Sequence, residues 1–223
     1  LGGFRCPKCG AQRHGADGAI TELLGANTFK LNLHGDMKAC EVKLPSIYNM
    51  YNAAGTIAAI GAAGLDTAPA FEAVSDFDCG FGRMERFSLG KKGAQMLLIK
   101  NTAAVNQTLE YITEQKGAKV VAFTMNNRAA DGRDPSWLED ANFEILAEDK
   151  GIKEIIVGGE IAELLTERLK KAGLECRVQN DYAALLKELE EKEEYIYIMP
   201  SYTAMLDLRQ RMVNKLGGKN FWE

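Results

Sequence analysis

The sequence has no long hydrophobic run and no excess of positive charge. None of its apolar segments reaches the roughly 20 residues that a helix needs to cross a bilayer, so no transmembrane segment is expected. The formal net charge is −4, from 27 Lys and Arg against 31 Asp and Glu. Because no basic stripe runs along the chain, nucleic acid is not an expected partner.

Two nucleotide-binding motifs are also missing. No G-x-x-x-x-G-K-[ST] loop is present, so an ATP site built from this chain alone would lack its phosphate cradle. No G-x-G-x-x-G opens a helix after a strand, and residues 157–160, Val-Gly-Gly-Glu, approximate it only weakly. An NAD-dependent enzyme is therefore disfavoured.

Cysteine is scarce and histidine scarcer. Five cysteines, an odd number, argue against a disulfide framework and indicate a reducing compartment. The chain starts at Leu1 without a signal-peptide pattern, so we expect the interior of a longer protein with a cytoplasmic location.

The first part of the chain mixes strand and helix signals. Residues 29–33 and 40–44 alternate between apolar and polar, which predicts an antiparallel pair with His34-Gly35-Asp36 as its turn. Residues 48–63 are rich in alanine and predict a tightly packed helix. A second, shorter helix is expected over residues 68–77.

Residues 80–93 hold four glycines and predict a loop or hinge. Beyond them, strand-length apolar runs alternate with helical patterns, which indicates βαβ units and a mainly parallel sheet. We therefore expect an α/β fold in two domains, an incomplete one over 1–92 and a Rossmann-like one over 93–223. The expected strands are 96–99, 120–124, 155–157, 176–178 and 195–199, and the expected helices are 103–115, 161–172, 182–193 and 203–216.

Cys6-Pro7-Lys8-Cys9-Gly10 has the spacing of a zinc-ribbon knuckle, in which backbone amides point at two thiolates. A structural zinc site needs four ligands, and no second C-x-x-C exists here. Cys40, Cys79 and Cys176 are scattered, and His14 and His34 are weak substitutes. The pattern favours half of a zinc ribbon over a redox pair, because a redox C-x-x-C should open a helix after a strand.

Residues 127–139, Asn-Arg-Ala-Ala-Asp-Gly-Arg-Asp-Pro-Ser-Trp-Leu-Glu, follow a strand-like run at 119–124. The carboxyl edge of an open α/β sheet is where ligands bind, and a structural turn needs fewer charges, so we expect no core role for this loop. An ordinary polar surface loop remains the alternative.

Three further positions are candidates. Asn52 lies near a helix start, where it either caps the helix or faces a ligand. Arg83 lies in the glycine-rich segment and suits a phosphate or a surface ion pair. Lys100 follows the first strand of the second domain, where it can reach a ligand phosphate.

Four strings, GRMERF, LIKNTAAVNQTL, NNRAADGRDPSWLEDANFEIL and YTAMLDLR, resemble the MurT family, the Mur-ligase relatives that form the ligase subunit of lipid II isoglutaminyl synthase. The resemblance runs over essentially the whole chain, and the DGRDPSW loop is its most specific part. It implies a Mur ligase carboxyl-terminal domain over 93–223, preceded by the remainder of a central ATPase domain with half of a zinc ribbon.

The resemblance also implies an activity in peptidoglycan synthesis. A GatD-type glutaminase partner releases ammonia from glutamine. The MurT subunit uses ATP and Mg²⁺ to activate the D-glutamate carboxylate of lipid II, which is amidated at the inner face of the membrane. A fragment of such a subunit is expected to be inactive alone.

Residue by residue, Asp134 matches the aspartate that completes a Cys-His-Asp triad across the subunit boundary, with Asp131 as its rival. Asn52, Arg83, Lys100 and Asn101 match nucleotide-contacting positions. Cys6 and Cys9 match one ligand pair of the ribbon, whose Zn site is incomplete in this chain.

The chain departs from the family pattern after Lys100, where the usual Asn-Pro-Ala-Gly is Asn101-Thr102-Ala103-Ala104. Glu139 also stands where an aromatic residue is common. The alternative to a ligase subunit is a non-catalytic module, a zinc ribbon with a Rossmann-like domain that binds a protein. Glutamine-dependent ATP hydrolysis by the full-length protein with its partner separates the two.

Overall fold

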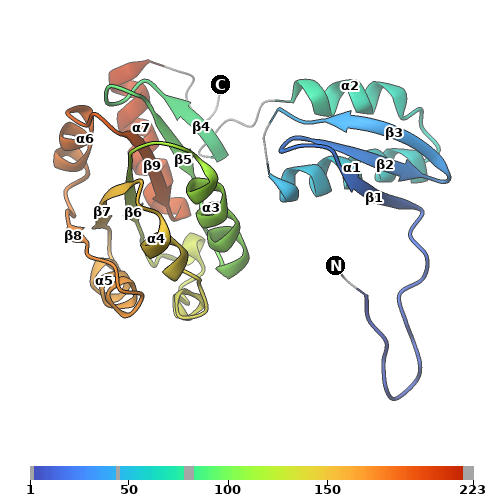
Figure 1. Cartoon of the computed structure of the whole chain (residues 1–223), viewed down its shortest axis with the longest axis horizontal. Helices are drawn as coiled ribbons and strands as arrows, with labels where there is room; N and C mark the ends of the chain where they lie inside the picture. The colour runs from blue at the N-terminus through green and yellow to red at the C-terminus, as the bar shows by residue number, and fades with distance from the viewer. Residues whose placement is uncertain (1–2, 44–45, 78–82, 218–223) are drawn as a thin grey trace. The chain divides into compact units, whose positions relative to one another are not determined.

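A computed structural model describes residues 3–43, 46–77 and 83–217 of the chain (Figure 1). It divides into two compact units, with the division between residues 78 and 79. In the described residues, no helix has both the length and the apolar character to cross a membrane.

The first unit contains a three-stranded antiparallel sheet in the order β1-β2-β3. Its strands are β1 (Gly18–Leu23), β2 (Thr28–Leu33) and β3 (Asp36–Glu41). The predicted turn between the last two is confirmed: Leu33 pairs with Asp36, and His34 and Gly35 both have positive φ, 52° and 99°, as a two-residue hairpin turn requires. The strand expected at residue 40 thus starts at Asp36, and β1 was not predicted.

Two helices complete this unit, α1 (Ile47–Ala62) and α2 (Ala68–Asp76), and both were predicted. Ser46 caps α1 by accepting from the Asn49 N–H at 3.4 Å, because a serine oxygen can take one of the free amides of a helix start. The core joins β2 to the helices, with Phe29, Leu31 and Ile57 at most 1% exposed.

The second unit is built on a six-stranded sheet in the order β4-β5-β9-β6-β7-β8. The five strands β5, β6, β7, β8 and β9 run parallel to one another, and β4 lies antiparallel to β5 at one edge. The predicted Rossmann-like sheet is confirmed. The strands are β4 (Arg83–Phe87), β5 (Ala94–Leu97), β6 (Lys119–Thr124), β7 (Ile152–Gly158), β8 (Arg177–Val178) and β9 (Tyr195–Pro200).

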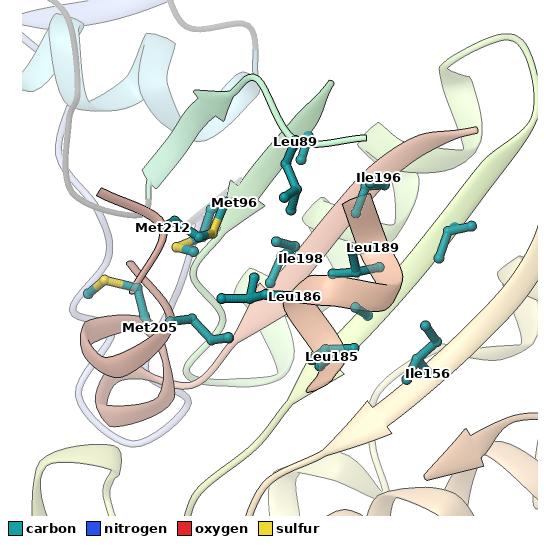
Figure 2. Close-up of a cluster of buried hydrophobic side chains, with 14 residues drawn as sticks. Leu89, Met96, Ile156, Leu185, Leu186, Leu189, Ile196, Ile198, Met205 and Met212 are labelled. Atoms are coloured by element: carbon teal, nitrogen blue, oxygen red, sulfur yellow. The ribbon is translucent and has the colours of Figure 1, made fainter. Parts of the chain in front are cut away.

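Helices cover both faces of this sheet (Figure 1). They are α3 (Thr102–Glu114), α4 (Glu144–Glu148), α5 (Ala162–Lys171), α6 (Tyr182–Glu190) and α7 (Tyr202–Leu216), with short 3₁₀ turns at Ala129–Asp131 and Ser136–Leu138. Side chains of α6 and α7 pack with alternate residues of β5 and β9, among them Met96, Ile196 and Ile198, as Figure 2 shows. On the opposite face, Tyr111 of α3 meets Tyr197 edge-on at 6.5 Å between ring centroids.

The prediction of a loop over residues 80–93 is wrong for the middle of this segment. Arg83–Phe87 forms β4 and pairs with β5. Gly90 and Gly93, with φ of 68° and 94°, lie in the connection between these strands, while Gly80 and Gly82 lie outside the described residues. The units consequently divide before β4 rather than near residue 92, because β4 finds its hydrogen bonds in the second sheet.

Candidate functional site

The loop at residues 127–139 follows the carboxyl end of β6. In the sheet, β9 is the direct neighbour of β6, and β5 lies on the other side of β9. A small hollow lies at the carboxyl edge of these strands. Four chain segments line it: the residues after β5, the segment that follows β6 with its loop, the start of α5 and the start of α7. The lining residues include Ile99, Lys100, Asn126, Asp131, Asp134, Trp137, Ile161, Ser201 and Tyr202. The structure thus brings Lys100 and Asp134, both expected from the sequence, to one hollow.

Asp131 is committed to the start of α7. Its carboxylate accepts from the Thr203 N–H at 2.8 Å and from Thr203 Oγ1 at 2.7 Å, and from the Arg128 N–H at 3.0 Å. Partial burial opposes ionisation, but the hydrogen bonds from Thr203, Arg128 and Ser201 outweigh it and lower the pKa of Asp131. This side chain therefore holds the loop to α7, and its lone pairs are largely used.

Asp134 has a different environment. It is exposed, and its carboxylate accepts from the Ser136 N–H at 3.0 Å, which with the Ser136 hydroxyl lowers the pKa of Asp134. No ion pair to Asp134 occurs among the described residues. The preceding residues Gly132 and Arg133 both have positive φ, 104° and 54°, so a tight and locally strained turn presents an ionised carboxylate to solvent.

The second half of the loop is anchored in the core, so the expectation that the loop has no core role is wrong there. Leu138 is 1% exposed, and its carbonyl accepts from Nε of Arg168 at 3.1 Å. Arg168, itself buried in α5, also pairs with Glu144 at 3.0 Å and lies 5.3 Å from the ring centroid of Phe143. The sequence gives no signal for this, because Arg168 reads as one more charge on an amphipathic helix.

Asn126 is a second residue that the sequence did not single out. It is buried two residues after the end of β6. Its N–H donates to Ser201 Oγ at 3.0 Å, and its Nδ2 donates to Thr203 Oγ1 at 3.0 Å. Its Oδ1 accepts from the Tyr182 hydroxyl at 3.2 Å. Asn126 thereby ties the ends of β6 and β9 to α6. A polar residue shortly after a largely apolar, fully buried strand was the available signal.

Of the four expected nucleotide-contacting residues, three lie in the second unit and one lies in the first. Lys100 is exposed and lines the hollow. Asn101 is the N-cap of α3 and accepts from the Ala104 N–H at 2.8 Å. Arg83 is an exposed residue of β4, and Asn52 is an exposed residue of α1 in the other unit. Only Lys100 is therefore placed at the hollow, and Asn101 adjoins it with a structural role.

Cys6 and Cys9 lie on a knuckle-like turn. The Gly10 N–H donates to the Cys6 carbonyl at 2.9 Å, and Gly10 has a φ of 75°. The backbone N–H groups of Cys9 and Lys8 lower the pKa of the Cys6 thiol, as amides directed at a sulfur do. The described residues hold no group of three or more His, Cys, Asp or Glu suited to a metal ion.

Comparison with solved structures defines the class of fold. The chain matches a pseudomurein peptide ligase type C from Methanothermus fervidus with a TM-score of 0.69 and 19% identity, over 96% of this chain and 45% of that one. It matches MurF from Acinetobacter baumannii with a TM-score of 0.68 and 18% identity, over 91% and 46%. A folylpolyglutamate synthase from Mycobacterium tuberculosis, solved with ADP and AMPPCP, matches with a TM-score of 0.65 and 12% identity, over 92% and 49%. The fold is that of the Mur ligases and their relatives.

Sequence comparison narrows this class. Residues 98–205 match the family model described as MurT ligase C-terminal. Over 219 residues the chain is 29% identical to the MurT subunit of lipid II isoglutaminyl synthase (glutamine-hydrolyzing) from Streptococcus pneumoniae strain R6, covering 96% of the chain and 49% of that protein. The subunit of the same name from Staphylococcus aureus strain COL is 30% identical over 221 residues, covering 98% and 49%. The resemblance to the MurT family is confirmed, and the chain spans about half the length of these relatives.

Proposed function

We propose that this chain contributes the carboxyl-terminal half of a MurT-type ligase subunit, which with a GatD-type glutaminase amidates the D-glutamate of lipid II at the expense of ATP. The names of the relatives, subunits of a glutamine-hydrolysing synthase, support a subunit that receives ammonia from a partner. The substrate is membrane-bound, so we place the reaction at the inner face of the membrane in peptidoglycan synthesis.

The observation that carries the proposal is the contrast between the two aspartates of the loop. A triad carboxylate must lie within hydrogen-bond reach of an imidazole, where it orients the ring and stabilises its charged form. Asp134 is exposed and ionised on a constrained turn, and the hydrogen bond from Ser136 leaves further lone pairs for a partner. Asp131 already accepts three hydrogen bonds from its own chain. Asp134 is consequently the residue that we assign to the partner's histidine.

We include ATP and Mg²⁺ in the proposal because the fold is that of the Mur ligases. Lys100, exposed at the carboxyl end of β5, is suited to a nucleotide phosphate as a mobile cation. Asn101 fixes the start of α3 beside it. We also propose nucleotide contacts for Arg83 and Asn52, which are exposed and so available to a ligand. The phosphate cradle itself is not among these residues.

Zinc is the third component of the proposal. Cys6 and Cys9 present two thiols on a turn of the kind that zinc ribbons use, and two ligands rarely hold zinc alone. We expect stoichiometric zinc in the full-length protein and its loss on Cys9→Ser, measured as metal content after dialysis against a weak chelator. Equal zinc content in the variant would contradict the assignment.

The test of the main proposal is glutamine hydrolysis by the full-length subunit mixed with its glutaminase. Asp134→Asn should leave the complex intact in size-exclusion chromatography but reduce kcat. Loss of a triad aspartate costs up to about 10⁴-fold in serine hydrolases, and a cysteine nucleophile, which is more acidic, should lose less.

Asp131→Asn is the matched control, because it changes the same group three residues away. Compared with Asp134→Asn, it should lower the free energy of unfolding by more and the rate of glutamine hydrolysis by less. Full activity in the Asp134→Asn complex would remove this role from Asp134. Failure of the wild-type pair to hydrolyse glutamine would leave a protein-binding module as the better description.

A further inference from the structure

A second hollow lies at the opposite, amino-terminal edge of the parallel strands in the second unit. It has a volume of about 680 Å³, within the roughly 300–1,000 Å³ typical of small-molecule sites. The starts of β5 and β9, the end of β4 and the last turn of α3 surround it. The described residues that line it are Arg86, Phe87, Ser88, Lys92, Gly93, Ala94, Gln95, Tyr111, Gln115, Lys116, Gly117, Ala118, Tyr195 and Tyr197.

Strand register builds one wall of this hollow. Arg86 of β4 pairs with Gln95 of β5, and Gln95 pairs with Tyr197 of β9. Residues paired across neighbouring strands point to the same face of a sheet, so these three side chains form one row. Tyr195, two residues before Tyr197, lies on the same face, and the two rings are 5.0 Å apart between centroids.

Internal hydrogen bonds hold part of the wall rigid. The Tyr111 hydroxyl donates to Gln95 Oε1 at 3.0 Å, and Gln95 Nε2 donates to the Met84 carbonyl at 3.1 Å. The hydroxyls of Tyr195 and Tyr197, in contrast, have no hydrogen-bond partner among the described residues. Neither oxygen is among the buried polar atoms without a partner, so both hydroxyls reach the accessible surface, although Tyr197 as a whole is only 4% exposed. They are therefore free donors at the surface of the hollow.

The charged residues that line the hollow are all basic. Arg86, Lys92 and Lys116 are exposed, none of them forms an ion pair within the described part of the chain, and none of the lining residues is acidic. Neighbouring lysines do have partners, since Lys91 pairs with Glu193. A small single-signed cluster of this kind attracts an anion.

The carboxyl end of α3 opposes an anion, because helix carbonyls carry partial negative charge there. Two of these carbonyls are already engaged. The Tyr111 carbonyl accepts from Gln115 Nε2 at 3.1 Å, and the Ile112 carbonyl accepts from Lys119 Nζ at 2.8 Å. Lys116 follows directly, so the balance at the hollow favours negative charge.

We infer that this hollow binds a small anion that carries a planar ring, of about the size of a nucleoside monophosphate. Arg86 and Lys116 pair with the phosphate or carboxylate, the hydroxyls of Tyr195 and Tyr197 donate to it or to ring substituents, and the half-buried ring of Tyr195 contacts the flat part of the ligand. The site lies at the strand edge opposite Lys100 and Asp134, so it is distinct from the proposed catalytic edge.

AMP, adenosine and inorganic phosphate are the probes, titrated into the full-length protein by isothermal calorimetry. AMP should bind at least about ten-fold more tightly than either adenosine or phosphate, because each of them offers only the ring or only the charge. Arg86→Ala should weaken AMP binding about ten-fold, the order expected for a charge-assisted hydrogen bond. Tyr197→Phe, which keeps the buried ring and removes only the hydroxyl, should weaken it several-fold.

Two control variants locate the signal. Lys170→Ala removes an exposed lysine from the last turn of α5 and should change nothing. Lys100→Ala probes the opposite strand edge, where the proposed nucleotide site lies. If the affinity follows Lys100 and not Arg86, AMP occupies the proposed nucleotide site, and the inference is overturned. Equal binding of AMP and phosphate, or no AMP binding, overturns it too, while leaving the glutaminase assay unaffected.

Discussion

Asp131 and Asp134 are three residues apart in one loop, yet their surroundings assign them different tasks. Asp131 accepts the Thr203 N–H and hydroxyl at the start of α7. Ser201, the N-cap residue, makes no side-chain capping bond, since its Oγ accepts from the Asn126 N–H instead. Asp131, although far from α7 in the sequence, therefore accepts hydrogen bonds at the start of this helix, as an N-cap side chain usually does.

This role makes the stability of the protein depend on pH. Asp131→Asn should lower the free energy of unfolding at pH 7 by about 1 kcal/mol, the usual cost of losing a cap. The pKa of Asp131 is lowered in the folded state, so its contribution is present above its ordinary value of about 4 and is lost as pH falls through the folded value. Urea unfolding of the wild type and of Asp131→Asn at pH 7 and pH 3 measures this contribution.

The difference between wild type and Asp131→Asn should shrink at the lower pH. Asp134→Asn is the comparison, because Asp134 is exposed and accepts only from Ser136. Its effect on unfolding should be smaller at both pH values. A constant difference for Asp131→Asn across pH would show that its ionisation does not stabilise the fold.

At the scale of elements, α5 holds the second half of the loop through Arg168. Arg168→Met keeps much of the side-chain length but leaves the Leu138 carbonyl and Glu144 without their donor. We expect the free energy of unfolding to fall by about 1–3 kcal/mol, and cleavage near residues 136–141 by a protease to become faster. Urea unfolding and limited proteolysis provide the two readouts.

Lys171→Met is the control for this prediction, because it lies on the same helix and bonds the same loop. Lys171 pairs with Glu139 at 3.1 Å, but both side chains are more than half exposed, 63% and 54%. Such a pair contributes about 0–1 kcal/mol. Equal losses of unfolding free energy in Arg168→Met and Lys171→Met would mean that the burial of Arg168 does not help to anchor the loop.

Much of this architecture could be predicted from the sequence, and the failures have physical causes. Strands β5 to β9 were recognisable because parallel strands are continuous apolar runs, and helices α3, α5, α6 and α7 were predicted between and after them. The five-residue helix α4 was not predicted. β4 was not, because an edge strand with Arg83, Glu85 and Arg86 buries little and its pattern is interrupted by a bulge. The candidate site was found only in part, because Asn126 and Arg168 act through contacts that are far apart in sequence.

At the scale of the whole molecule, the second unit should fold alone, because its sheet and its core are formed by its own residues. Residues 79–223 should show helical circular dichroism and one cooperative thermal transition. Arg209 of α7 makes a bidentate pair with Glu85 of β4, at 2.8 and 2.9 Å, in a largely buried position.

A second fragment, residues 93–223, tests where the unit begins. It lacks β4 and leaves Arg209 without Glu85, and breaking a buried pair costs about 3–5 kcal/mol. Its transition should therefore occur at a clearly lower temperature than that of residues 79–223. Equal stability of the two fragments would place the start of the domain near residue 93, as the sequence had indicated.

The two outer strands of the six-stranded sheet have a further consequence, for association between sheets. An outer strand offers unpaired backbone groups to any other chain, and long flat edges lead to aggregation. Here β8 has two residues, and β4 carries a bulge at Met84, whose φ is 59°, between the cations Arg83 and Arg86. Both borders of this sheet are thus poor templates for an added strand, so association with another chain by strand addition is disfavoured here.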